Sequence, residues 1–114
     1  MVRYDVYEDK VRALKKTLEE AGYSLDVDNL RVKLKELEGE LEKPEVWSDI
    51  EKSKHLSREA QQIRNKLDVF DKAEKAVADA GMMIELAEEE GDESVLAEVD
   101  KDLSEAEKEI EDIR

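Results

Sequence analysis

Carboxylates are the chemically active groups that this sequence supplies in quantity. Asp and Glu account for 33 of the 114 residues, against one histidine and no cysteine. The densest group is Glu88-Glu89-Glu90 with Asp92 and Glu93, and carboxylate oxygens are ligands that divalent cations such as Ca²⁺ prefer. This group lacks the alternating ligand spacing and the central glycine of a calcium loop. We therefore interpret it as the solvated acidic end of a helix.

The other candidates for catalysis or ligand binding are isolated residues. His55 has no cysteine and no second histidine to complete a metal site, so we interpret it as a solvated helix residue. Carboxylate pairs that catalyse hydrolysis need a walled pocket that shifts their pKa values, which amphipathic helices of this polarity rarely form. The four glycines are far apart and make no phosphate-binding loop. We therefore predict no catalytic, cofactor-binding or metal-ligating residues, and no enzymatic activity.

Composition narrows the class of protein further. Charged residues make up 46% of the chain and aromatic residues 4%, and apolar residues recur at helical spacing almost from end to end. This combination is typical of long helices and argues against disorder. The lack of cysteine excludes disulfides and thiol chemistry. No apolar run approaches membrane-spanning length, and the first residues lack the order of a secretion signal, so we expect a cytoplasmic protein.

Negative charge is concentrated in the last part of the sequence. Residues 85–114 contain 14 Asp or Glu and three Lys or Arg, a net charge of −11 out of a total of −14. Binding to nucleic acid is dominated by Lys and Arg that neutralise phosphates, so this balance argues against direct docking on DNA or RNA. A basic protein surface is the partner that the charge favours.

Apolar spacing predicts four helices, of which the first two are short. The first spans about 5–21 and ends at Gly22, because glycine readily takes the left-handed conformation of a helix C-terminus. The second follows Asp28 as its N-cap and ends before Pro44, which lacks a backbone N–H and forces the preceding residue out of helical angles. Their apolar stripes comprise Tyr7, Val11, Leu14, Leu18 and Ala21, then Leu30, Leu34, Leu37 and Leu41.

A long third helix and a final fourth helix follow. The third spans about 49–90, roughly 60 Å at 1.5 Å per residue. Its stripe shifts register between Phe70 and Ala73, where we expect a local change in supercoil or a change of packing partner. Asp92 is expected to cap the fourth helix. The two stripes comprise Leu56, Ala60, Ile63, Leu67, Phe70, Ala73, Val77, Ala80, Ile84 and Ala87, then Leu96, Val99, Leu103, Ala106, Ile110 and Ile113.

These helices predict the fold class. Their short connections favour antiparallel neighbours, and no helix can bury its stripe alone. We therefore predict an all-α fold over residues 1–114, a single helical domain. Its architecture is an elongated antiparallel bundle of coiled-coil hairpins with one long central helix.

The turn between the second and third helices holds the only proline and the only tryptophan of the chain. Ser48 and Glu51 have the spacing of a capping box, which predicts that the third helix starts there. Val46 and Trp47 lie between the end of the second helix and the start of the third. Trp47 is either a plug in the end of the bundle or an exposed binding anchor. We favour the plug, because Pro44 and Val46 fix it between two helices that need covering.

Several motifs resemble the amino-terminal helical domain of bacterial peptide chain release factor 2. They are Ser24-Leu25-Asp26, Leu37-Glu38, Glu40-Leu41-Glu42, Pro44-Glu45-Val46-Trp47, Glu85-Leu86-Ala87 and Gly91-Asp92-Glu93. The Pro-Glu-Val-Trp turn after a leucine-glutamate helix is the most specific motif and favours release factor 2 over release factor 1. The leucine, glutamate and lysine helices are not specific.

The resemblance implies a role in translation termination without catalysis. The family releases the peptide through Gly-Gly-Gln and, in release factor 2, reads stop codons through Ser-Pro-Phe. Here no two glycines are adjacent and the only proline stands between Lys43 and Glu45. The resemblance therefore implies the ribosome-docking domain of a class I release factor, directed towards the proteins at the base of the large-subunit stalk. A free-standing helical adaptor or coiled-coil oligomerisation module is the alternative, and self-association of the isolated chain is left open.

Overall fold

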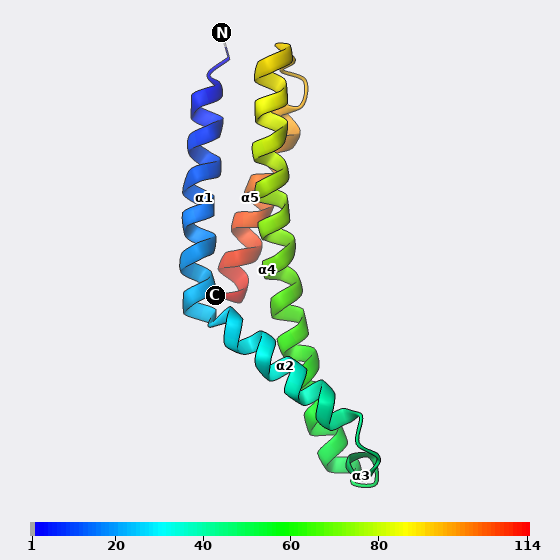
Figure 1. Ribbon diagram of the computed structural model, residues 1–114. Coiled ribbons are helices and arrows are strands. Elements are labelled where there is room, and N and C mark those ends of the chain that lie inside the picture. Colours follow the sequence, from blue (N-terminus) through cyan, green and yellow to red (C-terminus); the bar gives the residue numbers. More distant parts are fainter. Residues whose placement is uncertain (1) are drawn as a thin grey trace.

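The computed structural model describes residues 2–114, which form helices and, over that range, no strand. The helices are α1 (Tyr4–Leu25), α2 (Val27–Leu41), α3 (Pro44–Trp47), α4 (Ile50–Glu90) and α5 (Leu96–Ile113). Together they make a rod of 66 × 23 × 18 Å (Figure 1). The predicted all-α, elongated fold is confirmed. Over the described range, none of the helices is both long enough and apolar enough to cross a lipid bilayer.

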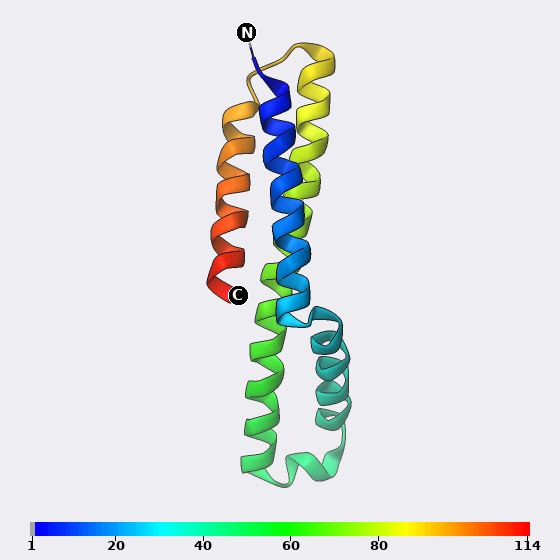
Figure 2. The ribbon, with the colours of Figure 1, turned by 90° about the vertical axis from the view of Figure 1, so that its left-hand side faces the viewer.

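Helix α4, with 41 residues, is the central helix, and every other helix packs against it. Helices α1 and α5 lie along its C-terminal half, and α2 and α3 lie along its N-terminal half (Figures 1 and 2). One half of the rod is therefore a three-helix bundle, and the other half is a helical hairpin. Because α1 has 22 residues and α2 has 15, neither alone can cover α4.

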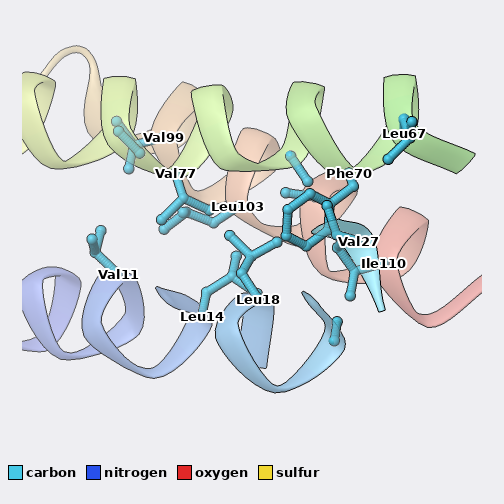
Figure 3. Packing of buried hydrophobic residues seen from close by; sticks show 14 of the residues in the cluster. Val11, Leu14, Leu18, Val27, Leu67, Phe70, Val77, Val99, Leu103 and Ile110 are labelled. Atoms are coloured by element: carbon cyan, nitrogen blue, oxygen red, sulfur yellow. The ribbon is translucent and has the colours of Figure 1, made fainter. Parts of the chain in front are cut away.

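The packing partner of α4 changes close to Phe70, which is one of the two outcomes that the register shift predicted. Arg31 of α2 forms an ion pair with Asp71, the residue after Phe70. The next residue, Lys72, lies 3.9 Å from the carboxylate of Glu109 on α5. Phe70, the residue before Asp71, is buried near Leu18 of α1 and Val27 of α2 (Figure 3). It therefore lies where the bundle meets the hairpin.

The predicted apolar stripes form one continuous core (Figure 3). On α4 the stripe residues from Ala60 to Ala87 are all buried, and on α5 those from Leu96 to Ile110 are buried. Of the four leucines predicted to line α2, only Leu37 is fully buried. The other three are partly buried against the core, because α2 packs mainly on α4 and has no third helix to cover its edges.

The junction between α1 and α2 differs from the prediction. Helix α1 continues past Gly22 to Leu25, and Asp26 takes the left-handed conformation, with φ of 55°. A Cβ atom added to Gly22 would lie 3.3 Å from the Phe70 ring, so this glycine permits close helix packing instead of ending the helix. Asp28 is not an N-cap, because α2 begins directly after Asp26 and places Asp28 in its first turn.

The predicted capping box at the start of α4 is also wrong. Asp49 is the N-cap, and its carboxylate accepts a hydrogen bond from the backbone N–H of Lys52 at 3.1 Å. The Ser48 hydroxyl instead donates to the carbonyl of Glu45 at 2.7 Å. This difference arises because Pro44 opens a one-turn helix, as proline at the first helical position favours. Ser48 therefore closes α3 and is not free to cap α4.

The connection between α4 and α5 was predicted in part. Gly91 ends α4 in the left-handed conformation, with φ of 67°. Asp92 does not cap α5, and its carboxylate accepts from the backbone N–H of Ser94 at 2.9 Å. Hydrogen bonding by the Ser94 side chain, and secondly by its backbone N–H, lowers the pKa of Asp92. Aspartate commonly bonds the backbone two residues ahead to form a turn. Helix α5 consequently begins only at Leu96, after that turn.

Candidate interaction surfaces

The tip of the rod, residues 40–53, is the first candidate surface. It comprises the end of α2, helix α3 and the first turn of α4 (Figure 1). Val46 is 2% exposed, whereas Trp47 is 56% exposed and Ile50 is 65% exposed. Consecutive helical residues point about 100° apart, so a single turn cannot bury both Val46 and Trp47 against α4. The prediction that Trp47 plugs the bundle is therefore wrong, and Val46 is the plug.

The Trp47 ring is held in place although it is exposed. Its indole N–H donates to the backbone carbonyl of Leu41, the last residue of α2. Carbonyls at the end of a helix have no partner within it, so this bond satisfies one of them and also satisfies the indole. What remains of the ring at the surface is apolar. Sequence reasoning missed this bond because it depends on how the chain turns around Pro44.

Carboxylates neighbour the exposed apolar residues of the tip along the sequence. Residues 40–53 contain five acidic and two basic side chains, a net charge of −3. Lys43 lies 2.8 Å from Glu40 and is neutralised by it. Glu42, Glu45 and Glu51 are exposed, and no ion pair within residues 2–114 involves them. We name Trp47 and Ile50 the apolar centre of the tip, and Glu42, Glu45 and Glu51 its acidic rim.

The opposite end of the rod is the second candidate surface, and we name it the acidic end. It comprises the start of α1, the end of α4 and the start of α5 (Figure 2). Hydrogen bonding to Glu8 raises the pKa of Glu88, with smaller contributions from burial and from the charge of Glu8. The Tyr4 hydroxyl donates to the carbonyl of Ala87 at 3.3 Å, and burial raises the pKa of Tyr4. The carboxylates here repel one another across α1 and α4.

Replacing Glu88 with glutamine is expected to raise the melting temperature more at pH 7 than at pH 4. In the folded chain the pKa of Glu88 is raised above its ordinary value of 4.5. The folded chain therefore binds the Glu88 proton more tightly than the unfolded chain does. The free energy of unfolding therefore falls as pH rises from below 4.5 through the raised pKa of Glu88. Glutamine carries no ionisable proton, so the Glu88→Gln variant does not show this fall. Thermal melts followed by circular dichroism measure it, with Glu89→Gln as the exposed control. Equal shifts at both pH values would contradict the prediction.

The sequence-predicted candidates other than the tip are not brought together into a site. The His55 side chain is 79% exposed, and its Nε2 lies 3.9 Å from a Glu59 oxygen. Glu59 is paired instead with Lys33 of α2 at 2.7 Å, a contact that lowers the pKa of Glu59. Among residues 2–114, no cluster of three or more His, Cys, Asp or Glu side chains has an arrangement suited to a metal ion. His55 is thus a solvated residue on the surface of α4.

Comparison with known proteins finds similarity over most of the chain. Residues 30–114 match the family model described as PCRF domain. Peptide chain release factor 2 of Saccharopolyspora erythraea is 35% identical over 101 residues, which are 89% of this chain and 28% of that protein. Peptide chain release factor 2 of Acidithiobacillus ferrooxidans is 41% identical over 85 residues, covering 75% of this chain and 23% of that protein. The chain thus spans about a quarter of the length of these relatives.

Proposed function

The chain belongs to the PCRF domain family and matches the amino-terminal region of bacterial peptide chain release factor 2, and from this membership we propose that it docks a class I release factor on the ribosome. In this proposal residues 1–114 act as a single helical domain in the cytoplasm. The domain orients the factor and contributes neither codon reading nor peptide release. The observation that carries the proposal is the family match over residues 30–114.

The shape of the rod supports a docking role. Helix α5 ends about midway along α4, so the tip projects well beyond the C-terminal residue (Figure 1). A catalytic region connected to α5 would therefore be held apart from the tip by the α2–α4 hairpin. The rod is 66 Å long, a length suited to joining two places on a large assembly. We propose that the proteins at the base of the large-subunit stalk are the partner.

The charge of the chain supports protein as the direct partner. The net charge of −14 repels the phosphates of bare ribosomal RNA, and residues 85–114 supply −11 of it. Basic ribosomal protein would attract the same surface and speed the encounter. The negative charge of residues 85–114 would then keep the domain away from exposed RNA while the factor finds its place.

The chain alone is expected to bind ribosomes without releasing peptide. In excess, it should slow peptide release by intact release factor 2 of Acidithiobacillus ferrooxidans, because both would occupy one docking place. The measurement is release of labelled peptide from ribosomes stalled at a stop codon. An Ile84→Asp variant, which places a charge at a position only 1% exposed, is the control and should not compete.

Two outcomes of this assay would contradict the proposed function. Stop-codon-dependent release by the chain alone would show that it carries the chemistry that we assign elsewhere. A folded chain that neither binds ribosomes nor slows the intact factor would instead favour a free-standing helical adaptor. Sedimentation of the chain at increasing concentration would then show whether that adaptor self-associates.

A further inference from the structure

We propose that the tip is a docking surface anchored by the indole ring of Trp47, and that it takes a basic protein surface containing an apolar pocket. This proposal rests on the proposed function, because the partner is sought on the ribosome. It adds the place of contact on this chain, the side chain that anchors it and the chemical class of the partner surface.

The apolar centre of the tip has the properties of a binding anchor. Trp47 and Ile50 are more than half exposed, at one end of the rod, whereas Val46 is buried in α3, the helix that packs on α4 and α2. The bond from the indole to Leu41 holds the ring in one position before any partner arrives. Tryptophan is enriched among residues that dominate binding energy, and a side chain that is already ordered loses less entropy on binding.

The internal role of Trp47 does not account for its exposed ring. Its hydrogen bond to Leu41 uses only the N–H edge of the indole. The residue as a whole is left 56% exposed, although a large aromatic surface gains most when it is removed from water. A contact that covers the ring would recover that gain without disturbing the fold.

The acidic rim selects the class of partner. With a net charge of −3 over residues 40–53, the tip repels RNA phosphates, and it also repels the same surface on a second copy of the chain. A pocket bordered by lysine or arginine would instead meet Glu42, Glu45 and Glu51 with opposite charge. Complementary rim charges of this kind set specificity and encounter rate, while the buried apolar anchor sets affinity.

The test uses the fact that Trp47 is the only tryptophan of the chain. Chain labelled with 5-fluorotryptophan gives one fluorine signal, and adding large ribosomal subunits should shift and broaden it. Trp47→Ala should weaken binding to these subunits by about 30-fold or more, as expected for a binding hot spot. Tyr23→Ala is the matched control, because Tyr23 is an aromatic residue 80% exposed outside the tip. It should change the affinity less than twofold.

A second variant protects the test against misfolding. Circular dichroism establishes whether Trp47→Ala keeps its helices. Should it fail to do so, Ile50→Ser takes its place, because Ile50 is 65% exposed and has less packing to lose. We expect Ile50→Ser to weaken binding by about fivefold, a smaller loss than that of the central anchor.

The outcomes separate this proposal from the proposed function. Unmodified chain that does not bind large subunits would overturn the proposed function and this inference with it. Binding that survives Trp47→Ala and Ile50→Ser unchanged would overturn the tip as the docking surface and leave the proposed function standing. Protein-free 23S ribosomal RNA should not shift the fluorine signal. A shift as large as that with intact subunits would overturn the assignment of a basic protein partner.

Discussion

A chain that begins at residue 27, and so lacks α1, is expected to lose about 4 to 8 kcal/mol of its free energy of unfolding. Val11, Leu14 and Leu18 of α1 are buried between α4 and α5 (Figure 3). Removing α1 also removes the entropy cost of ordering it, so the loss comes from the surfaces that it leaves uncovered.

The uncovered surfaces explain the size of this effect. Ile84 lines a groove with Val11, Val77 lines one with Leu18, and Leu103 of α5 lines one with Leu14. Full exposure of each such side chain costs about 1.5 to 3 kcal/mol. The family match begins at residue 30 and leaves all of α1 outside it. The matched region is therefore expected to be a poor folding unit by itself.

Urea unfolding followed by circular dichroism at 222 nm measures the loss, with residues 1–114 and 27–114 compared at equal concentration. Glu20→Ala in the full chain is the control, because Glu20 is exposed and its replacement leaves the helix interface intact. Sedimentation should be run in parallel, since two shortened chains that paired would cover the same surfaces. Monomeric 27–114 with the unfolding midpoint of the full chain would contradict the prediction.

Phe70→Ala is expected to destabilise the fold by about 3 to 5 kcal/mol, the usual cost of emptying a large buried aromatic site. Phe70 is buried at the joint between the bundle and the hairpin, with Gly22 of α1 directly beside its ring. The cavity would open where α1 gives way to α2, so neither helix can close it without moving the other. Chemical unfolding measures the cost. Val69→Ala, at the half-buried neighbouring position, should cost less than about 1.5 kcal/mol.

A double-mutant cycle tests the assigned contact between Phe70 and Gly22. Alanine favours a helix interior over glycine by about 1 kcal/mol, but a methyl group on Gly22 would lie 3.3 Å from the Phe70 ring. Gly22→Ala should therefore stabilise the Phe70→Ala variant by more than it stabilises the parent chain. Equal effects of Gly22→Ala in both backgrounds would show that the two positions do not interact.

The location of the candidate surface was predictable from the sequence, but its orientation was not. Pro44 and Trp47 marked the turn between two helices correctly. The orientation depended on whether Pro44 began a helical turn. It does, and in that turn Val46 is buried and Trp47 is exposed. The acidic end was predictable from composition, because charges on amphipathic helices face away from the apolar stripe. The proximity of Glu8 and Glu88 was not, because 80 residues separate them in the chain.

The sequence by itself determined which faces of the long helices are buried, where α4 breaks at Gly91, and where the negative charge is concentrated. These features depend on local periodicity and composition, which the chain carries without reference to its fold. Only the tertiary structure decided where α1 ends and which residue caps α4. Alternative caps and helix ends differ by only about 1 kcal/mol, whereas burying one large apolar side chain contributes about 1.5 to 3 kcal/mol. Packing of Gly22 beside Phe70 therefore outweighed the preference of glycine for a helix C-terminus. Burial of Val46 likewise outweighed the preference of Ser48 for an N-cap.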